Sequence, residues 1–137
     1  MVSMDRSLTG QGLAVEPLST KREPVLESVT SAALTSALDG LALRQRTIAN
    51  NIANVNTPNY HAQRVSFENA LAQSVSERSG AVSATTKRSM DPTNVNGNNV
   101  NLDTETLSNI DTVLRYQFAA RAVEGPFTSM RTAMRTS

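Results

Sequence analysis

The chain has 137 residues, of which 39% are apolar and only 4% aromatic, so it fits one domain and does not favour a large self-contained core. It has no Cys, which excludes disulfides, thiolate chemistry and cysteine zinc sites. A net charge of +1 with mixed signs, and no apolar run near the ~20 residues of a spanning helix, give no reason to expect nucleic-acid binding or direct membrane insertion.

The N-terminal third predicts a tail followed by a long helix. Residues 1–24 are rich in Ser, Thr, Gly and Pro without a hydrophobic period, so we expect a disordered, mobile N-terminal tail. From Pro24 onward, apolar positions alternate at spacings of 4 and 3 residues, which predicts a helix over about residues 26–56 with a heptad seam. The seam consists of Leu34, Leu38, Leu41, Gln45, Ile48, Ile52 and Val55.

A turn is expected directly after this helix. Pro58 disfavours helical geometry in the residue before it, so the helix must end by Thr57. The sequence Thr57-Pro58-Asn59-Tyr60 predicts a type II turn, in which Asn59 takes the position that needs a positive φ.

In the middle segment, residues 61–100, the stretch 76–100 holds few large apolar side chains and several turn signals. Val65, Phe67, Leu71 and Val75 form a weak amphipathic patch. We therefore expect a long, irregular and mobile segment with a short helix, in which a short hairpin is also possible.

Neither metal-site candidate in this segment is convincing. His61 is the only histidine and has no Cys or helix-spaced acidic neighbour, so we interpret it as an exposed loop residue. Asn94, Asn96 and Asp103 imitate part of a calcium loop, but Pro92 would occupy its first ligand position, which favours a plain turn.

A second helix is predicted over about residues 102–135. Asn101 or Asp103 can cap it, and Leu107, Ile110 and Leu114 begin its apolar face. Because Pro126 removes a backbone hydrogen bond and clashes with the preceding turn, we expect a kink or break near residues 125–126. The second seam is Val113, Tyr116, Ala120, Val123, Phe127, Met130 and Met134.

The resulting fold prediction is all-α. Residues 25–137 form a single helical domain, whose two long terminal helices pair as an antiparallel, coiled-coil-like hairpin. Because two helices bury each seam from one side only, we expect a marginal monomer that orders fully only in an assembly.

No catalytic motif, metal site or cofactor site stands out, so the chain is not expected to be an enzyme. Candidate contacts with a neighbouring subunit are polar or adaptable side chains that lie on the second seam or beside the seams. Three amides lie on the non-seam side of the first helix, and amides both donate and accept hydrogen bonds. The set is Asn50, Asn51, Asn54, Arg115, Tyr116, Arg121, Met130 and Met134. For the arginines, a solvated face is an equally good interpretation.

A resemblance narrows these possibilities. The stretch Ala49 to Tyr60, ANNIANVNTPNY, resembles the N-terminal motif ANNIANxNTPGY of bacterial flagellar rod and hook proteins, with Asn59 in place of the usual Gly. NGNNVNLDTE, residues 96–105, and LRYQ, residues 114–117, are similar to the proximal rod subunits of this family. The longer tail and Gly125-Pro126 depart from the family pattern.

The resemblance implies a structural subunit of the flagellar basal body that is exported through the flagellar type III apparatus. It would polymerise into the proximal part of the drive shaft outside the cytoplasmic membrane, as a homo- and hetero-oligomeric helical array. Its implied neighbours are other rod proteins, the ring-to-rod adaptor and the membrane ring protein. The alternative is a soluble helical adaptor or chaperone-like module of the export system, which binds one partner helix in a groove.

Overall fold

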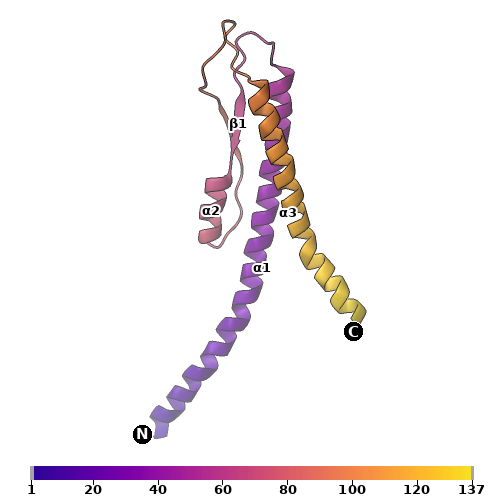
Figure 1. The fold of residues 1–137 in the computed structure, drawn as a ribbon. Helices are drawn as coiled ribbons and strands as arrows, with labels where there is room; N and C mark the ends of the chain where they lie inside the picture. The colour runs from indigo at the N-terminus through magenta and orange to yellow at the C-terminus, as the bar shows by residue number, and fades with distance from the viewer. Residues whose placement is uncertain (1, 137) are drawn as a thin grey trace.

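A computed structural model describes the backbone of residues 2–136 and the side chains of residues 26–125. Its elements are α1 (Val2–Ala53), β1 (Gln63–Ser66), α2 (Glu68–Ser76), β2 (Thr85–Arg88) and α3 (Leu102–Thr136). The helices α1 and α3 run antiparallel and lie side by side next to the loops that join them (Figure 1). The predicted pairing of two long helices is confirmed, but the small sheet means that the fold is not strictly all-α.

The bounds of α1 differ from the prediction at both ends. The helix begins at Val2 rather than near residue 26, so an irregular tail over residues 1–24 is wrong for the backbone, while the mobility of this stretch stays a prediction. Once a helix has a stable nucleus, adding further turns costs little, so a helix can extend beyond its heptad seam. At the other end α1 stops at Ala53, three residues before the expected end at 56.

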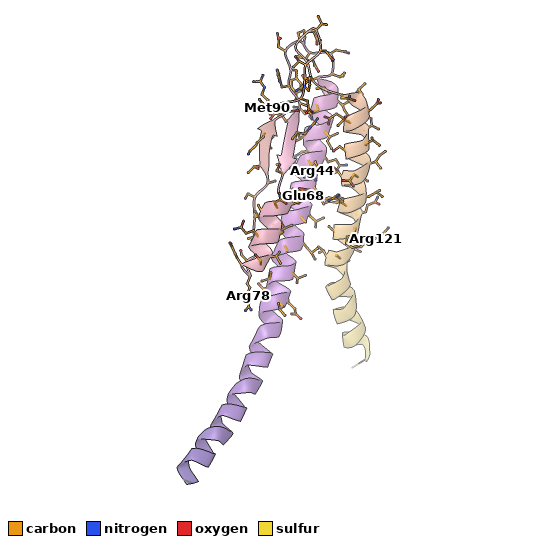
Figure 2. All side chains as sticks on the ribbon, turned by 60° about the vertical axis from the view of Figure 1, so that its left-hand side comes forward. Arg44, Glu68, Arg78, Met90 and Arg121 are labelled. Carbon is orange, nitrogen blue, oxygen red and sulfur yellow. The ribbon has the colours of Figure 1, made fainter. Side chains whose placement is uncertain are left out.

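The middle segment is more regular than expected. β1 and β2 pair antiparallel with Gln63 opposite Arg88 and Ser66 opposite Thr85, and α2 lies between them in sequence. The sheet and α2 lie along α1 (Figures 1 and 2), and the first turn of α3 also reaches β1, where Arg64 lies 2.6 Å from Glu105. The sequence signal was weak because hydrogen bonds hold much of this segment and need no large apolar side chains.

One such anchor is Gly80, in the loop that leads to β2. The hydroxyl of Ser36 on α1 donates to the Gly80 carbonyl at 2.8 Å and accepts from the Val82 N–H at 3.1 Å. Gly80 has a φ of 74°, and a Cβ there would lie 2.5 Å from the Val29 carbonyl oxygen. The loop therefore touches the backbone of α1 where only glycine fits.

The small core lies where α1 meets the sheet, α2 and α3. Its buried members are Leu41, Val65, Phe67 and Ala119. A Cβ on Gly40 would lie 2.6 Å from the Phe67 ring, so this aromatic side chain packs directly against the backbone of α1. A core of this size fits the low apolar content of the chain.

α3 turns an unexpected line of residues toward α1. Its most buried side chains are Glu105, Thr112 and Ala119, which are seven residues apart and so share one face of the helix. α3 also continues past residues 125–126 to Thr136, so the predicted break there is wrong, while a kink stays a prediction. Proline removes one hydrogen bond, and the turns on both sides keep theirs.

Candidate assembly site: the asparagine network and the outer face of α3

Asn51, in the last turn of α1, is completely buried and uses its whole amide. Its Nδ2 donates to the Gln63 carbonyl at 3.0 Å and to Glu105 Oε2 at 3.2 Å. Its Oδ1 accepts from the Gln63 N–H at 2.9 Å and from the Tyr60 hydroxyl at 3.2 Å. One side chain therefore fastens α1 to the first residue of β1 and to the first turn of α3.

The partner of Asn51 on α3 is a carboxylate without exposed surface. Glu105 Oε1 accepts from Arg64 Nη1 at 2.6 Å, while Oε2 accepts from Asn51. Arg64 also lies 3.6 Å from the exposed Asp91 carboxylate. A buried carboxylate is costly unless its charge and its lone pairs are compensated, and here both are.

Two further asparagines tie the loop before α3 to the rest of this end. Asn98 is fully buried and donates to the carbonyls of Asn54, directly after α1, and of Thr57, in the following turn, at 2.9 and 2.8 Å. Asn99 accepts from the Ala62 N–H at 2.7 Å. We call Asn51, Arg64, Asn98, Asn99 and Glu105 the polar clamp, because they join α1, β1 and α3 by hydrogen bonds.

The turn after α1 follows the prediction. The Tyr60 N–H donates to the Thr57 carbonyl at 3.3 Å across Pro58, and Asn59 has a φ of 61°. The Asn59 N–H donates to the Asn96 carbonyl at 2.9 Å, so the turn also pairs with the loop before α3. At the start of that helix, Asn101 is the cap, since its Oδ1 accepts from the Thr104 N–H at 3.1 Å.

A second polar contact holds α2 against α1. Arg44 donates to both carboxylate oxygens of Glu68 at 2.7 and 2.6 Å, and also to the Val65 carbonyl at 3.0 Å. Its guanidinium lies 4.9 Å from the centre of the Phe67 ring (Figure 2 shows Arg44 and Glu68 side by side). The hydrogen bond from Arg44 lowers the pKa of the Glu68 carboxyl from its ordinary value.

Among residues 26–125 there is no group of three or more His, Cys, Asp or Glu side chains that could hold a metal ion. Within the described part of the chain no helix has the length and apolarity needed to cross a bilayer. The hydrogen bonds described above hold α1, α2, α3 and the sheet against one another, which suits a structural role.

Comparison with known proteins identifies the class. A family model for flagella basal body rod proteins matches residues 33–61, which include Asn51 and the turn. The flagellar basal body rod protein FlgB of Bacillus subtilis is 34% identical, and the match covers 80% of this chain and 95% of that protein. The chain belongs to the FlgB family of flagellar basal body rod proteins. FlgB of Borrelia hermsii is 53% identical over 38 residues, 28% of each chain.

Membership in the FlgB family makes the chain a structural subunit of the flagellar basal body rod and places it in the basal body. As a rod protein it assembles with other components of that structure. The resemblance stated on residues 49–60 and on the C-terminal third is therefore confirmed.

The structure separates the three amides that were predicted to contact a neighbour. Asn50 is exposed and donates to the Tyr60 hydroxyl at 3.0 Å, and the half-buried Asn54 donates to the Asn50 carbonyl at 2.8 Å. Asn51, in contrast, has no exposed surface and makes its hydrogen bonds within the chain, so the prediction of a neighbour contact does not fit it. The heptad spacing placed Asn51 on the non-seam side of the helix, but it did not indicate that β1 covers that side.

The remaining interface candidates lie on α3. Arg115 and Arg121 are exposed and Tyr116 is 38% exposed. Arg115 forms an ion pair with Asp111 at 2.8 Å. Met130 and Met134 lie outside the residues whose side chains the structure describes.

The seam residues are buried to different degrees. In the first seam, Leu41 and Ile48 are buried, Leu34 and Leu38 are half-buried, and Gln45 and Ile52 are exposed, while Val55, which lies beyond the end of α1, is half-buried. On α3, Val113, Ala120 and Val123 are half-buried, and Phe127 lies outside the described side chains.

What the sequence prediction missed is the polarity of the α3 contact face. Glu105 and Thr112 occupy it, whereas Leu107, Ile110 and Leu114, expected to begin the packed face, are 53–68% exposed. One signal could have indicated that Glu105 is buried. Its stretch, NGNNVNLDTE, occurs together with the asparagine-rich stretch ANNIANVNTPNY, and asparagine amides can donate the hydrogen bonds that a buried carboxylate needs.

Proposed function

We propose that this rod subunit polymerises into the proximal part of the flagellar drive shaft and passes torque between its neighbours through the paired helices α1 and α3. In this role the subunit is a mechanical element. It must keep α1 and α3 in one relative position while force acts on both, and it must offer surfaces to the subunits around it.

The polar clamp is the observation that supports this proposal. Asn51, with no exposed surface, bonds to β1 and to Glu105 of α3 at the same time, and Arg64 completes the link. Hydrogen bonds to a charged group have a preferred direction, so a network of them resists sliding and rotation better than apolar contact alone. Four of the five clamp residues, Asn51, Asn98, Asn99 and Glu105, lie in segments that the family resemblance singles out, which connects the clamp to the function the family shares.

The neighbours we propose are other rod proteins, the ring-to-rod adaptor and the membrane ring protein, reached after export through the flagellar type III apparatus. Contacts between copies that all point the same way are heterologous and generate an open helical array. Asn50, Tyr116 and Arg121 have exposed surface and are the side chains we propose for such contacts.

The proposal is tested in the source organism by deleting the gene and complementing it. The deletion strain should lack flagella and fail to swim, and wild-type complementation should restore both. Complementation with Arg121→Glu should restore export of the subunit but give fewer complete basal bodies in electron micrographs. Normal swimming of the deletion strain would exclude a role in the rod, and full assembly with Arg121→Glu would exclude this residue from the contacts.

A further inference from the structure

The side of α3 that faces away from α1 carries an exposed apolar stripe. Leu107 is 68% exposed, Ile110 53%, Leu114 61% and Phe118 77%. Spacings of 3, 4 and 4 residues place these side chains along one line of an α-helix. Among the described residues this is a contiguous row of large apolar side chains open to solvent, and such a row on a soluble protein marks a contact surface.

The charges at the two ends of the stripe identify its occupant. Asp103 lies four residues before Leu107 and Arg121 three residues after Phe118, so both continue the same line, and both are exposed. Figure 2 shows Arg121 on the side of α3 away from α1. The face is therefore acidic at its N-terminal end, apolar along its length and basic at its C-terminal end.

Such a face is complementary to an inverted copy of itself. If two α3 helices run antiparallel, Asp103 meets Arg121 of the second copy and Leu107 meets its Phe118. Ile110 then meets Leu114 of the second copy, and all three pairs centre on residues 112–113. On the flank, Asp111 and Arg115, which form an exposed ion pair within the chain, lie near the same pair of the second copy. In a parallel pair the same face would place like charges opposite each other, which is unfavourable.

From this complementarity we infer that a second copy of this chain docks on the outer face of α3 in antiparallel orientation, giving a two-fold symmetric dimer before the subunit enters the rod. An isologous contact of this kind closes on itself. A shaft whose subunits all point the same way contains no such two-fold axis across its length, so the dimer is a state of the chain outside the rod. In the dimer, the second copy covers the apolar stripe until rod neighbours replace it. This dimer is a state that the proposed function does not include.

Sedimentation velocity of the full chain over a range of micromolar concentrations tests the dimer. The wild-type chain should shift from monomer to dimer as concentration rises. Leu114→Glu, at the centre of the stripe, should remain monomeric, and because this side chain is exposed, far-UV circular dichroism should be unchanged. Ala49→Glu adds the same charge at an exposed position of α1 and should dimerise like wild type. A wild-type chain that stays monomeric, or dimers of Leu114→Glu, would overturn the inference.

Orientation is tested by disulfide formation, because the chain has no native Cys. In the antiparallel pair, Leu107 lies opposite Phe118 of the second copy, whereas the two Leu107 positions are about 16 Å apart along the axis, from eleven residues at ~1.5 Å. That separation exceeds the 4–7 Å between Cα atoms that a disulfide needs. A mixture of Leu107→Cys and Phe118→Cys chains should therefore form the mixed disulfide several-fold more than either homodisulfide. Efficient self-linking of Leu107→Cys would instead show a parallel contact and refute the proposal.

A charge exchange provides a test that leaves the apolar stripe intact. Asp103→Arg and Arg121→Asp should each raise the dimer dissociation constant several-fold, since each places like charges opposite each other in both symmetric halves. The double variant should return close to the wild-type value. Failure of the double variant to recover, while both single variants are weakened and folded, would contradict the pairing of these two residues. If the chain had no role in the rod, the sedimentation, disulfide and charge-exchange results would be unchanged. The dimer and the proposed rod function can therefore be refuted independently.

Discussion

Replacing Asn51 by leucine tests the polar clamp directly. Leucine has a similar size and branching, so the variant removes hydrogen bonds without opening a large cavity. It leaves the Gln63 N–H and carbonyl and one oxygen of the buried Glu105 without their partner. A buried polar group that loses its partner costs about 1–3 kcal/mol, and more when it is charged. Because Gln63 is only half-buried, we expect a total loss of about 3–5 kcal/mol in the free energy of unfolding.

The assay is urea unfolding of the purified chain followed by far-UV circular dichroism, and Asn50→Leu is the matched control. Asn50 is the same residue type at the preceding position, but it is exposed and donates only to the Tyr60 hydroxyl at 3.0 Å. Its replacement should change the free energy of unfolding by no more than about 0.5 kcal/mol. If the two variants differ by less than about 1 kcal/mol, the clamp does not hold α1 to α3 and the reasoning is wrong.

Two further predictions concern the contact between α1 and α2. Gly40→Ala should lower the free energy of unfolding by about 1–2 kcal/mol in a urea titration, because a Cβ 2.6 Å from the Phe67 ring forces repacking that outweighs the gain in helix propensity. The hydrogen bond from Arg44 lowers the pKa of Glu68 in the folded chain below the ordinary value of 4.5. The ionised carboxylate therefore contributes its full share to the free energy of unfolding above pH 4.5, and this share is lost as pH falls through the lowered pKa. Thermal unfolding measured from pH 6 to pH 3 should therefore show a smaller acid loss of stability for Glu68→Gln than for wild type, and equal losses would contradict the assignment.

Local backbone chemistry made several features predictable from the sequence. Pro58 forces an end to the helix before it, and Asn59 tolerates the positive φ that the turn requires, so this turn could be placed to the residue. Asn101 has a short acceptor side chain before an acidic first turn, which is the usual signal of a helix cap. Both rules depend on neighbours in sequence, and tertiary contacts did not override them.

The contact faces of the helices were harder to predict, because apolar character was used as the signal for burial. In α3, Glu105 and Thr112 are buried while Phe118 is 77% exposed, the reverse of that signal. A carboxylate can be buried only if donors from distant segments reach it, and Asn51 and Arg64 are 54 and 41 residues away in sequence. No pattern within one helix contains that information.

The same separation along the chain determines when the subunit becomes rigid. Asn51 forms a hydrogen bond with Glu105, which lies 54 positions later in the sequence. The clamp therefore cannot form while only the first hundred residues of the chain are present. Until Glu105 arrives, the amide of Asn51 and the guanidinium of Arg64 lack the carboxylate that joins them, and α1 has no partner helix. Long-range closure of this kind is slow compared with local helix formation. The relative position of α1 and α3 can therefore be fixed by the clamp only when the C-terminal third of the chain is present.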